Sequence, residues 1–186
     1  MGKEKLFMLL LGCKPEGRFT EQHDVFFSIG HSLTDLLPQI KAYWPGNHTI
    51  HIDAWREVTR VDGYAVVVTG RNEMDTADTE KLFFLNLGGY KENEFEEFHY
   101  KMLVVTKDKG TASQKARQTA FYKHAHFAGA DSHIDDKYGV DVDDLYEIAD
   151  ILPAAAKEKF SLLLQPAADS GEDEWHIGYT KLSSLA

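Results

Sequence analysis

The chain has 186 residues, of which 43% are hydrophobic and 27% charged, the balance of a soluble globular protein. The net charge of −10 argues against nucleic acid and anionic membranes as partners. A single cysteine, Cys13, excludes an intrachain disulfide and is typical of the reducing cytoplasm, and no apolar run approaches the ~20 residues of a membrane span.

The first elements in chain order predict two strands and a helix. The run 5–11 is apolar on both faces, which favours a central strand, and 23–30 alternates as a second strand. Ser32 is placed to cap a helix, with Asp35 three residues later. Because proline costs about 3 kcal/mol inside a helix, we expect the regular helix to begin at Pro38.

Two further strands complete the first unit. They are predicted over 48–58 and 64–69, joined across the turn Asp62-Gly63. The polar stretch 70–80 reads as a linker. A second helix is expected over about 111–124, with Thr111 or Ser113 as its cap.

The N-terminal pattern recurs in mid-chain, which predicts a tandem duplication. Identical residues, in order, are Lys5, Leu6, Phe7, Leu9, Leu11, Gly12, Glu16, Phe19, Glu21 and His23 against Lys81, Leu82, Phe83, Leu85, Leu87, Gly88, Glu92, Phe95, Glu97 and His99. Later matches join His51-Ile52-Asp53 to His133-Ile134-Asp135, and Asp62 and Tyr64 to Asp144 and Tyr146. A third start matches Phe160, Leu162, Leu163, Leu164, Glu174 and His176 to Phe7, Leu9, Leu10, Leu11, Glu21 and His23.

The predicted fold class is therefore α+β, with two β-β-α-β-β units, mainly antiparallel sheet and pseudo-twofold symmetry. The boundaries are 1–69 for the first repeat, 70–80 for the linker and 81–150 for the second repeat. Residues 151–186 are expected to be a partial third repeat, a strand pair that completes the fold.

Several short motifs of the first repeat resemble a known family. They are Leu11-Gly12, Glu21-x-His23-Asp24, Trp44-x-Gly46, His51-x-Asp53 and Asp62-Gly63-Tyr64. Together they resemble the bacterial family called domain of unknown function 1543, which occurs in one or two copies. The resemblance implies no activity, cofactor or substrate. Tyr100 replaces the aspartate after the histidine in the second repeat, so the first repeat is the better candidate for a site.

The residues with most chemical potential form two pairs, Glu21-x-His23 and His51-x-Asp53. Spacing of two on a strand places both members of a pair on one face. If the second and third strands are neighbours, two imidazoles and two carboxylates meet, a set that suits Zn²⁺, Mn²⁺ or Fe²⁺. The equivalents in the second repeat are Glu97, His99, His133 and Asp135.

Two other interpretations of these pairs stay open. A carboxylate two residues from a histidine often makes only a cross-strand hydrogen bond, and His23 continues the apolar face of Val25, Phe27 and Ile29. The second open interpretation is acid–base catalysis by the same histidines and carboxylates. A nucleophilic Cys13 beside His23 has little support, because Gly89 stands at the position of Cys13 in the second repeat.

The sequence favours a non-enzymatic bacterial protein that binds a small ligand or a partner at the groove between the repeats, or forms a homodimer. The alternative is a metal-dependent, hydrolase-like enzyme built on Glu21, His23, His51 and Asp53. The geometric question that separates them is whether His23 and His51 lie within about 5 Å of one another, since two ligands of one zinc ion cannot sit much further apart.

Overall fold

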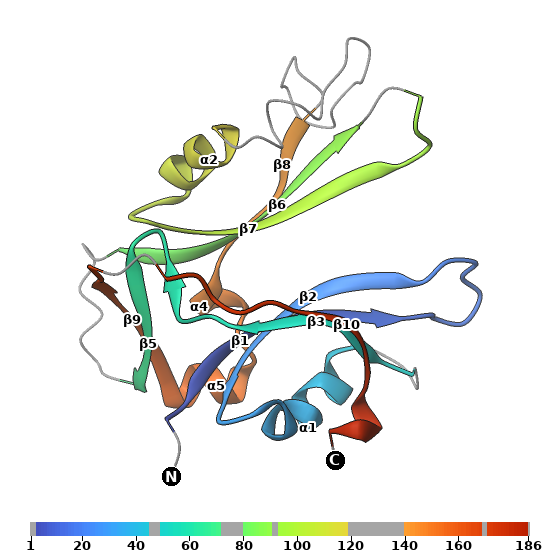
Figure 1. Ribbon diagram of the computed structural model, residues 1–186, viewed down its shortest axis with the longest axis horizontal. Coiled ribbons are helices and arrows are strands. Elements are labelled where there is room, and N and C mark those ends of the chain that lie inside the picture. The colour runs from blue at the N-terminus through green and yellow to red at the C-terminus, as the bar shows by residue number, and fades with distance from the viewer. Residues whose placement is uncertain are drawn as a thin grey trace. The chain divides into compact units, whose positions relative to one another are not determined.

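The computed structural model describes residues 3–44, 49–71, 80–90, 93–118, 140–168 and 171–185. The chain divides into two compact units. The first comprises Met1–Met74 and Ile151–Ala186, and the second comprises Asp75–Asp150 (Figure 1). The C-terminal segment therefore belongs to the first unit.

The main sheet of the first unit has four antiparallel strands in the order β10-β3-β1-β2. They are β1 (Lys5–Cys13), β2 (Gln22–Gly30), β3 (His51–Glu57) and β10 (His176–Lys181). The apolar sequence of β1 buries nearly every position, because this strand has a neighbour on each side and is covered on both faces. The prediction of a central first strand is confirmed.

Helix α1 (Leu33–Tyr43) packs on one face of this sheet (Figure 1). It begins with a capping box, in which Ser32 accepts from the Asp35 backbone and Asp35 accepts from the Ser32 backbone. The helix continues through Pro38, so the expectation that regular helix starts there is wrong. Burial of Leu36 and Ile40 against the sheet holds the helix together across the proline.

A second sheet of the first unit has the order β4-β5-β9, from β4 (Arg60–Val61), β5 (Tyr64–Gly70) and β9 (Phe160–Pro166). The predicted turn joins β4 and β5, with Asp62 and Gly63 both at positive φ (52° and 78°), as a two-residue hairpin requires.

The two C-terminal strands do not pair with one another, contrary to expectation. Strand β9, which follows α5 (Ala154–Lys159), pairs with β5 along its length, and β10 extends the main sheet beside β3. Each covers an edge that the first repeat leaves open, which satisfies backbone groups that a separate hairpin would leave exposed. The short helix η1 (Leu182–Ser184) ends the described chain.

The described part of the second unit contains a three-stranded antiparallel sheet in the order β7-β6-β8, with helix α2 packed on it. Its elements are β6 (Lys81–Tyr90), β7 (Glu97–Thr106), α2 (Lys109–Arg117) and β8 (Val140–Glu147), followed by α4 (Ile148–Ile151). Asp108 caps α2 by accepting from the Thr111 backbone at 2.8 Å, so the predicted caps are wrong. The last residues of the predicted helix lie outside the described residues.

The register of β8 corrects the repeat alignment in its second half. Phe83 pairs with Glu147 and Leu87 with Val142, as Phe7 pairs with Glu57 and Leu11 with Ile52. Strand β8 is thus the counterpart of β3, and the matching of Asp144 and Tyr146 to the β4–β5 turn is wrong. Within the described part of the second unit, β8 is followed by α4 rather than by a fourth strand.

Candidate metal site

His23 and His51 meet across the central strand rather than on neighbouring strands. Strands β2 and β3 flank β1, and Gly12 pairs with His23 on one side and with His51 on the other. Paired residues of antiparallel strands point to the same face. The expected meeting of the two histidines therefore takes place, although the expected adjacency of their strands does not.

Gly12 makes this meeting possible because it has no side chain. A Cβ atom at Gly12 would fall 2.4 Å from His51 Nε2 and 2.6 Å from Asp53 Oδ2, closer than real contacts allow. The space above the central strand is thus filled by the tips of two side chains of β3. Sequence reasoning found Gly12 only as a matched position of the repeats and as part of a family motif.

Asp53 lies at a β-bulge of β3, two residues after His51 and on the same face. The register against β1 shifts between Leu10 and Leu11, which pair with Ala54 and Ile52, and leaves Asp53 as the extra residue. A bulge re-aims one side chain without ending the strand. Asp53 and His51 face the same space, while Ile52 stays in the core beneath α1.

Both imidazoles contact both carboxylates. His51 Nε2 lies 3.2 Å from Glu21 Oε1 and 3.3 Å from Asp53 Oδ1. His23 Nε2 lies 3.2 Å from Asp53 Oδ2 and 3.6 Å from Glu21 Oε2. One ligand atom from each of Glu21, His23 and His51 lies within 4.8 Å of the others, so the criterion set by the sequence is met.

The four side chains differ in exposure. His51 is almost fully buried, with 6% of its side chain exposed, and Asp53 is 25% exposed. Glu21 and His23 are 42% and 43% exposed. His51 and Asp53 therefore form the less exposed side of the cluster, and Glu21 and His23 form the side that faces solvent.

One oxygen of Asp53 has no hydrogen-bond partner among the described residues. This Oδ2 is buried, and His23 Nε2 stands 3.2 Å away without the alignment of a hydrogen bond. A buried unsatisfied carboxylate oxygen is costly. The spacing is close to that of two ligands of one tetrahedral zinc, about 3.3 Å when each bond is about 2.05 Å.

Strand β10 adds aromatic contacts beside the cluster. The Tyr179 ring lies 4.6 Å from the His51 ring, and His176 stacks on Trp55 at 3.8 Å. Tyr179 belongs to a second irregularity, since Ile177 pairs with Ala54 and Thr180 with Ile52. The sequence singled out neither Tyr179 nor its strand as part of a site, because only the sheet order places β10 here.

The second unit holds part of a similar arrangement. Gly88 pairs with His99 on β7, and Glu97 Oε2 is 4.0 Å from His99 Nε2. On the other side Gly88 pairs with Asp141, the position that His51 occupies in the first unit. The predicted equivalents His133 and Asp135 lie outside the described residues, so their role stays a prediction.

Cys13 is buried in the core beneath α1. Burial and the nearby charge of Glu21 raise the pKa of its thiol, which opposes formation of the nucleophilic thiolate. A catalytic role for Cys13 therefore has no support in its surroundings.

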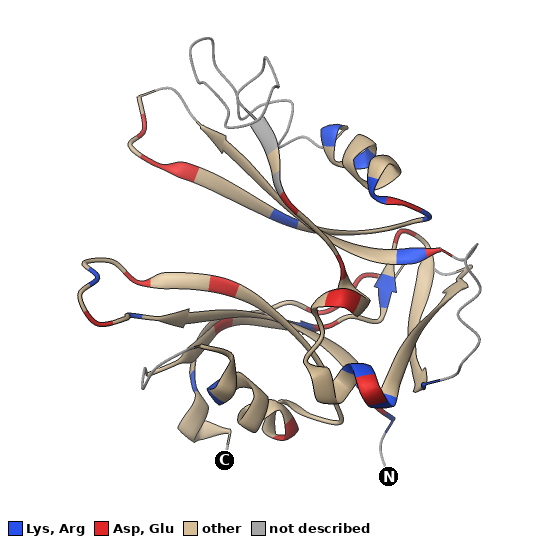
Figure 2. Ribbon diagram, turned by 180° about the vertical axis from the view of Figure 1, so that it is seen from behind, with Lys and Arg blue, Asp and Glu red and all other residues tan. Residues whose placement is uncertain are grey.

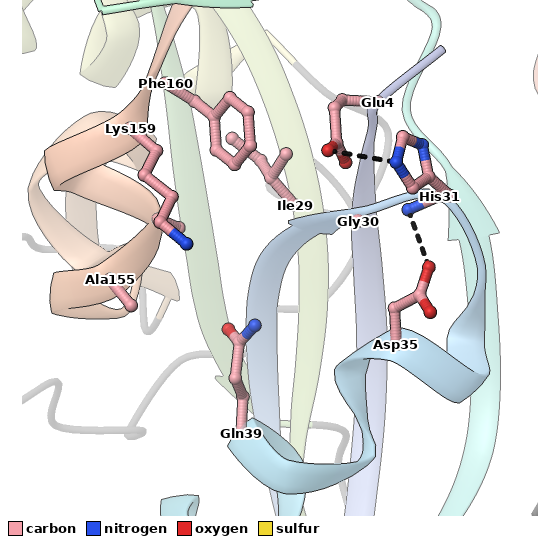
Figure 3. Close-up of a pocket in the computed structure, with 10 residues that line it drawn as sticks. Glu4, Ile29, Gly30, His31, Asp35, Gln39, Ala155, Lys159 and Phe160 are labelled. Carbon is pink, nitrogen blue, oxygen red and sulfur yellow. Dashed lines mark hydrogen bonds and ion pairs between the residues drawn. The ribbon is translucent and has the colours of Figure 1, made fainter. Parts of the chain in front are cut away.

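A separate cavity of about 190 Å³ lies within the first unit, between α1 and α5 (Figure 3). Its polar groups are largely engaged with one another. His31 Nε2 lies 3.2 Å from Glu4, and Asp35 accepts from the His31 backbone as part of the α1 cap. Gln39 accepts from Ser28. The histidine–carboxylate cluster is the stronger candidate because it contains a buried carboxylate oxygen, Asp53 Oδ2, without a hydrogen-bond partner among the described residues.

Basic and acidic segments are interspersed along the strands and helices of each unit (Figure 2). Among the described residues, no helix has the length and apolar character needed to cross a membrane. The sequence also predicts that the protein does not bind nucleic acid and that it is cytoplasmic. Both of these stay predictions.

Comparison with known proteins supports the family resemblance over the first unit. Residues 18–68 match the model of the family described as Domain of Unknown Function (DUF1543), and this single match includes the four candidate ligands. The match covers one copy, so the expectation of two family copies stays a prediction. No curated protein matches the chain.

A solved structure shares the fold. The crystal structure of a protein Il1583 from Idiomarina loihiensis aligns with a TM-score of 0.55 and 22% sequence identity. The alignment covers 96% of this chain and 97% of that chain. At this identity the similarity shows an α+β fold, mostly of antiparallel sheet, and carries no function.

Proposed function

We propose that the first unit contains a binding site for a divalent transition-metal ion. The ion is held by His23 and His51 together with Glu21 and Asp53. The observation that carries this proposal is the convergence of two imidazole nitrogens on two carboxylates around the unpartnered Asp53 oxygen. Two carboxylates this close repel one another, and a divalent cation removes that repulsion. Nitrogen ligands with carboxylates suit Zn²⁺, Mn²⁺ or Fe²⁺.

Isothermal titration of the tag-free chain with Zn²⁺ and Mn²⁺ tests the proposal. We expect one high-affinity site, and we expect His23→Ala to weaken binding by more than roughly a hundredfold, because even groups that only orient a ligand contribute ten- to hundredfold. His31→Ala is the matched control, since its side chain is 41% exposed, as His23 is 43%. Equal binding by the wild type and His23→Ala would refute the assignment.

A hydrolytic activity is the second candidate, favoured by the exposure of Glu21 and His23. Catalytic metal sites keep an open position, whereas structural sites are closed. A metal held by these four residues would polarise a water or carbonyl, and His51 and Asp53, the less exposed pair, would orient Glu21 and His23. Metal-dependent hydrolysis of an activated ester that disappears in His23→Ala supports this candidate, and turnover that is insensitive to chelator argues against it.

We also infer that the two units arose by duplication. The inference is supported by the equivalent register of β1 with β6, by a bulge at the matching point of β3 and β8, and by a glycine opposite a histidine in both. A twofold relation between the copies, a ligand groove between them and a homodimer stay predictions. The non-enzymatic function expected from that groove is accordingly the weaker proposal.

A further inference from the structure

The row of residues that forms the site extends onto the C-terminal strand. Lys181 of β10 pairs with His51, which pairs with Gly12, which pairs with His23. Directly paired residues of antiparallel strands share a face and lie close together. Lys181 is therefore on the same face of the sheet as the proposed metal ligands, on the strand next to His51.

The side chain of Lys181 is exposed. It makes no hydrogen bond or ion pair with the residues that the structure describes; only its backbone carbonyl is engaged, by Ser184 Oγ at 2.7 Å. A lysine with a long flexible stem and no partner is free to approach a ligand at the neighbouring cluster. This separates it from Lys5, whose ammonium lies 2.7 Å from Glu57.

The irregular backbone of β10 brings a second residue to the same place. Gly178 has a φ of 137°, and Gly178 and Tyr179 lie in the bulge opposite Asp53. Tyr179 packs on His51 yet is 59% exposed. Strand β10 thus borders the cluster with an aromatic ring and a cation.

The charges of this extended site favour an anion. The carboxylates of Glu21 and Asp53 balance the charge of a divalent ion, and Lys181 then leaves an excess of one positive charge. An anion with one oxygen on the metal and another near the ammonium matches that excess. A neutral ligand gains less from Lys181 than an anion does, and a cationic ligand is repelled by it.

We propose that the metal site binds a small monoanionic carboxylate, with Lys181 as the residue that selects for its charge. This inference rests on the metal site proposed above. It assigns β10, the C-terminal strand of the first unit, to ligand recognition rather than only to completion of the sheet.

Cobalt(II) in place of the native metal provides a visible spectrum for the test. The cobalt-loaded chain is titrated with acetate, and in parallel with uncharged acetamide, at constant ionic strength. We expect acetate but not acetamide to change the spectrum, and Lys181→Met to weaken acetate binding by roughly five- to tenfold, the effect of one nearby charge partly screened by water.

Lys41→Met is the matched control, because Lys41 is an exposed lysine on α1, which covers the other face of the sheet. It should titrate as the wild type does, and Lys181→Arg should retain most of the acetate affinity. If cobalt binds but acetate has no effect, or if Lys181→Met matches the wild type, the carboxylate proposal is overturned while the metal site stands. If cobalt does not bind to the wild type, the metal site itself is overturned.

Discussion

At the scale of single residues, the site depends on a position that contributes no side chain. Gly12 lies in the most buried strand of the first unit, between the two histidines. Glycine inside a strand weakens the strand and often marks a close approach of other groups. Here the approaching groups are the imidazole of His51 and the carboxylate of Asp53.

Replacement of Gly12 by alanine should therefore damage the site more than the fold. The added methyl group displaces His51 Nε2 and Asp53 Oδ2. We expect Gly12→Ala to lower metal affinity roughly ten- to hundredfold and the free energy of unfolding by about 1–3 kcal/mol. Titration calorimetry and urea unfolding measure the two effects.

Gly70→Ala is the control, because nothing lies within 4 Å of the position of its added Cβ atom. It should leave both the metal affinity and the free energy of unfolding near their wild-type values. Unchanged metal affinity in Gly12→Ala would show that the two histidines do not act together over the central strand.

Four ligand candidates were predictable from the sequence because strand alternation is a local property. Spacing of two residues places Glu21 and His23 on one face of the sheet, and does the same for His51 and Asp53. The bulge at Asp53 is the one part of this arrangement that spacing does not predict. Lys181 and Tyr179 were not predictable, because their place depends on which strand pairs with β3. Which strand pairs with the open edge of β3 depends on the whole fold, and no short sequence motif predicts it.

At the scale of elements, the repeat alignment failed in its second half. The identical string at 51–53 and 133–135 indicated equivalence, whereas backbone pairing makes β8 the equivalent of β3. Both strands carry the bulge at the same point, so it does not explain the error; Asp141 rather than His133 stands opposite Gly88, as His51 stands opposite Gly12. Sequence identity over three residues is too weak to fix such a register.

Helix α1 depends on its cap more than an ordinary helix, because Pro38 removes one internal hydrogen bond. Ser32→Ala removes the side chain that accepts from the Asp35 backbone. We expect the free energy of unfolding to fall by about 1 kcal/mol, measured by urea denaturation. Ser183→Ala, an exposed serine of η1, should change it little; equal effects would contradict the assigned cap.

Helix α2 has a cap that titrates. Hydrogen bonds from Thr111 lower the pKa of the Asp108 carboxyl. A lowered folded-state pKa means that this contribution to stability is present above the unfolded pKa and is lost as pH falls through the folded pKa. Asp108→Asn, which keeps a capping side chain without a titrating charge, should lack this acid-dependent loss.

Carbon NMR of the Asp108 carboxyl group measures the titration directly. Its midpoint should lie below that of an exposed aspartate, and the protection factor of the Thr111 amide against exchange should fall as pH falls through that midpoint. A titration midpoint equal to that of an exposed aspartate would contradict the assignment of Asp108 as a charged cap of α2.

At the scale of the whole molecule, each of the two units has a core of its own. The α+β class and the boundary near residues 70–80 were predictable because apolar strands and a polar linker are visible in the sequence. The return of residues 151–186 to the first unit was expected only as completion of the fold. The actual partners, β5 for β9 and β3 for β10, required the structure.

Metal removal should destabilise the first unit selectively. All three tryptophans, Trp44, Trp55 and Trp175, belong to that unit, so their fluorescence reports its unfolding. A metal present at a hundred times its dissociation constant stabilises the folded state by about 2.7 kcal/mol. We expect chelator to lower the denaturation midpoint seen by tryptophan fluorescence, and His23→Ala to abolish that sensitivity to chelator. An unchanged midpoint for the wild type would contradict metal binding in this unit.

The most direct measurement is anomalous diffraction from crystals of the full chain grown with Zn²⁺ and collected on both sides of the zinc edge. We expect one strong anomalous peak above Gly12, within bonding distance of His23 Nε2 and His51 Nε2 and of oxygens from Glu21 or Asp53. A map with no peak between the two histidines, in crystals that bind zinc elsewhere, would contradict this expectation.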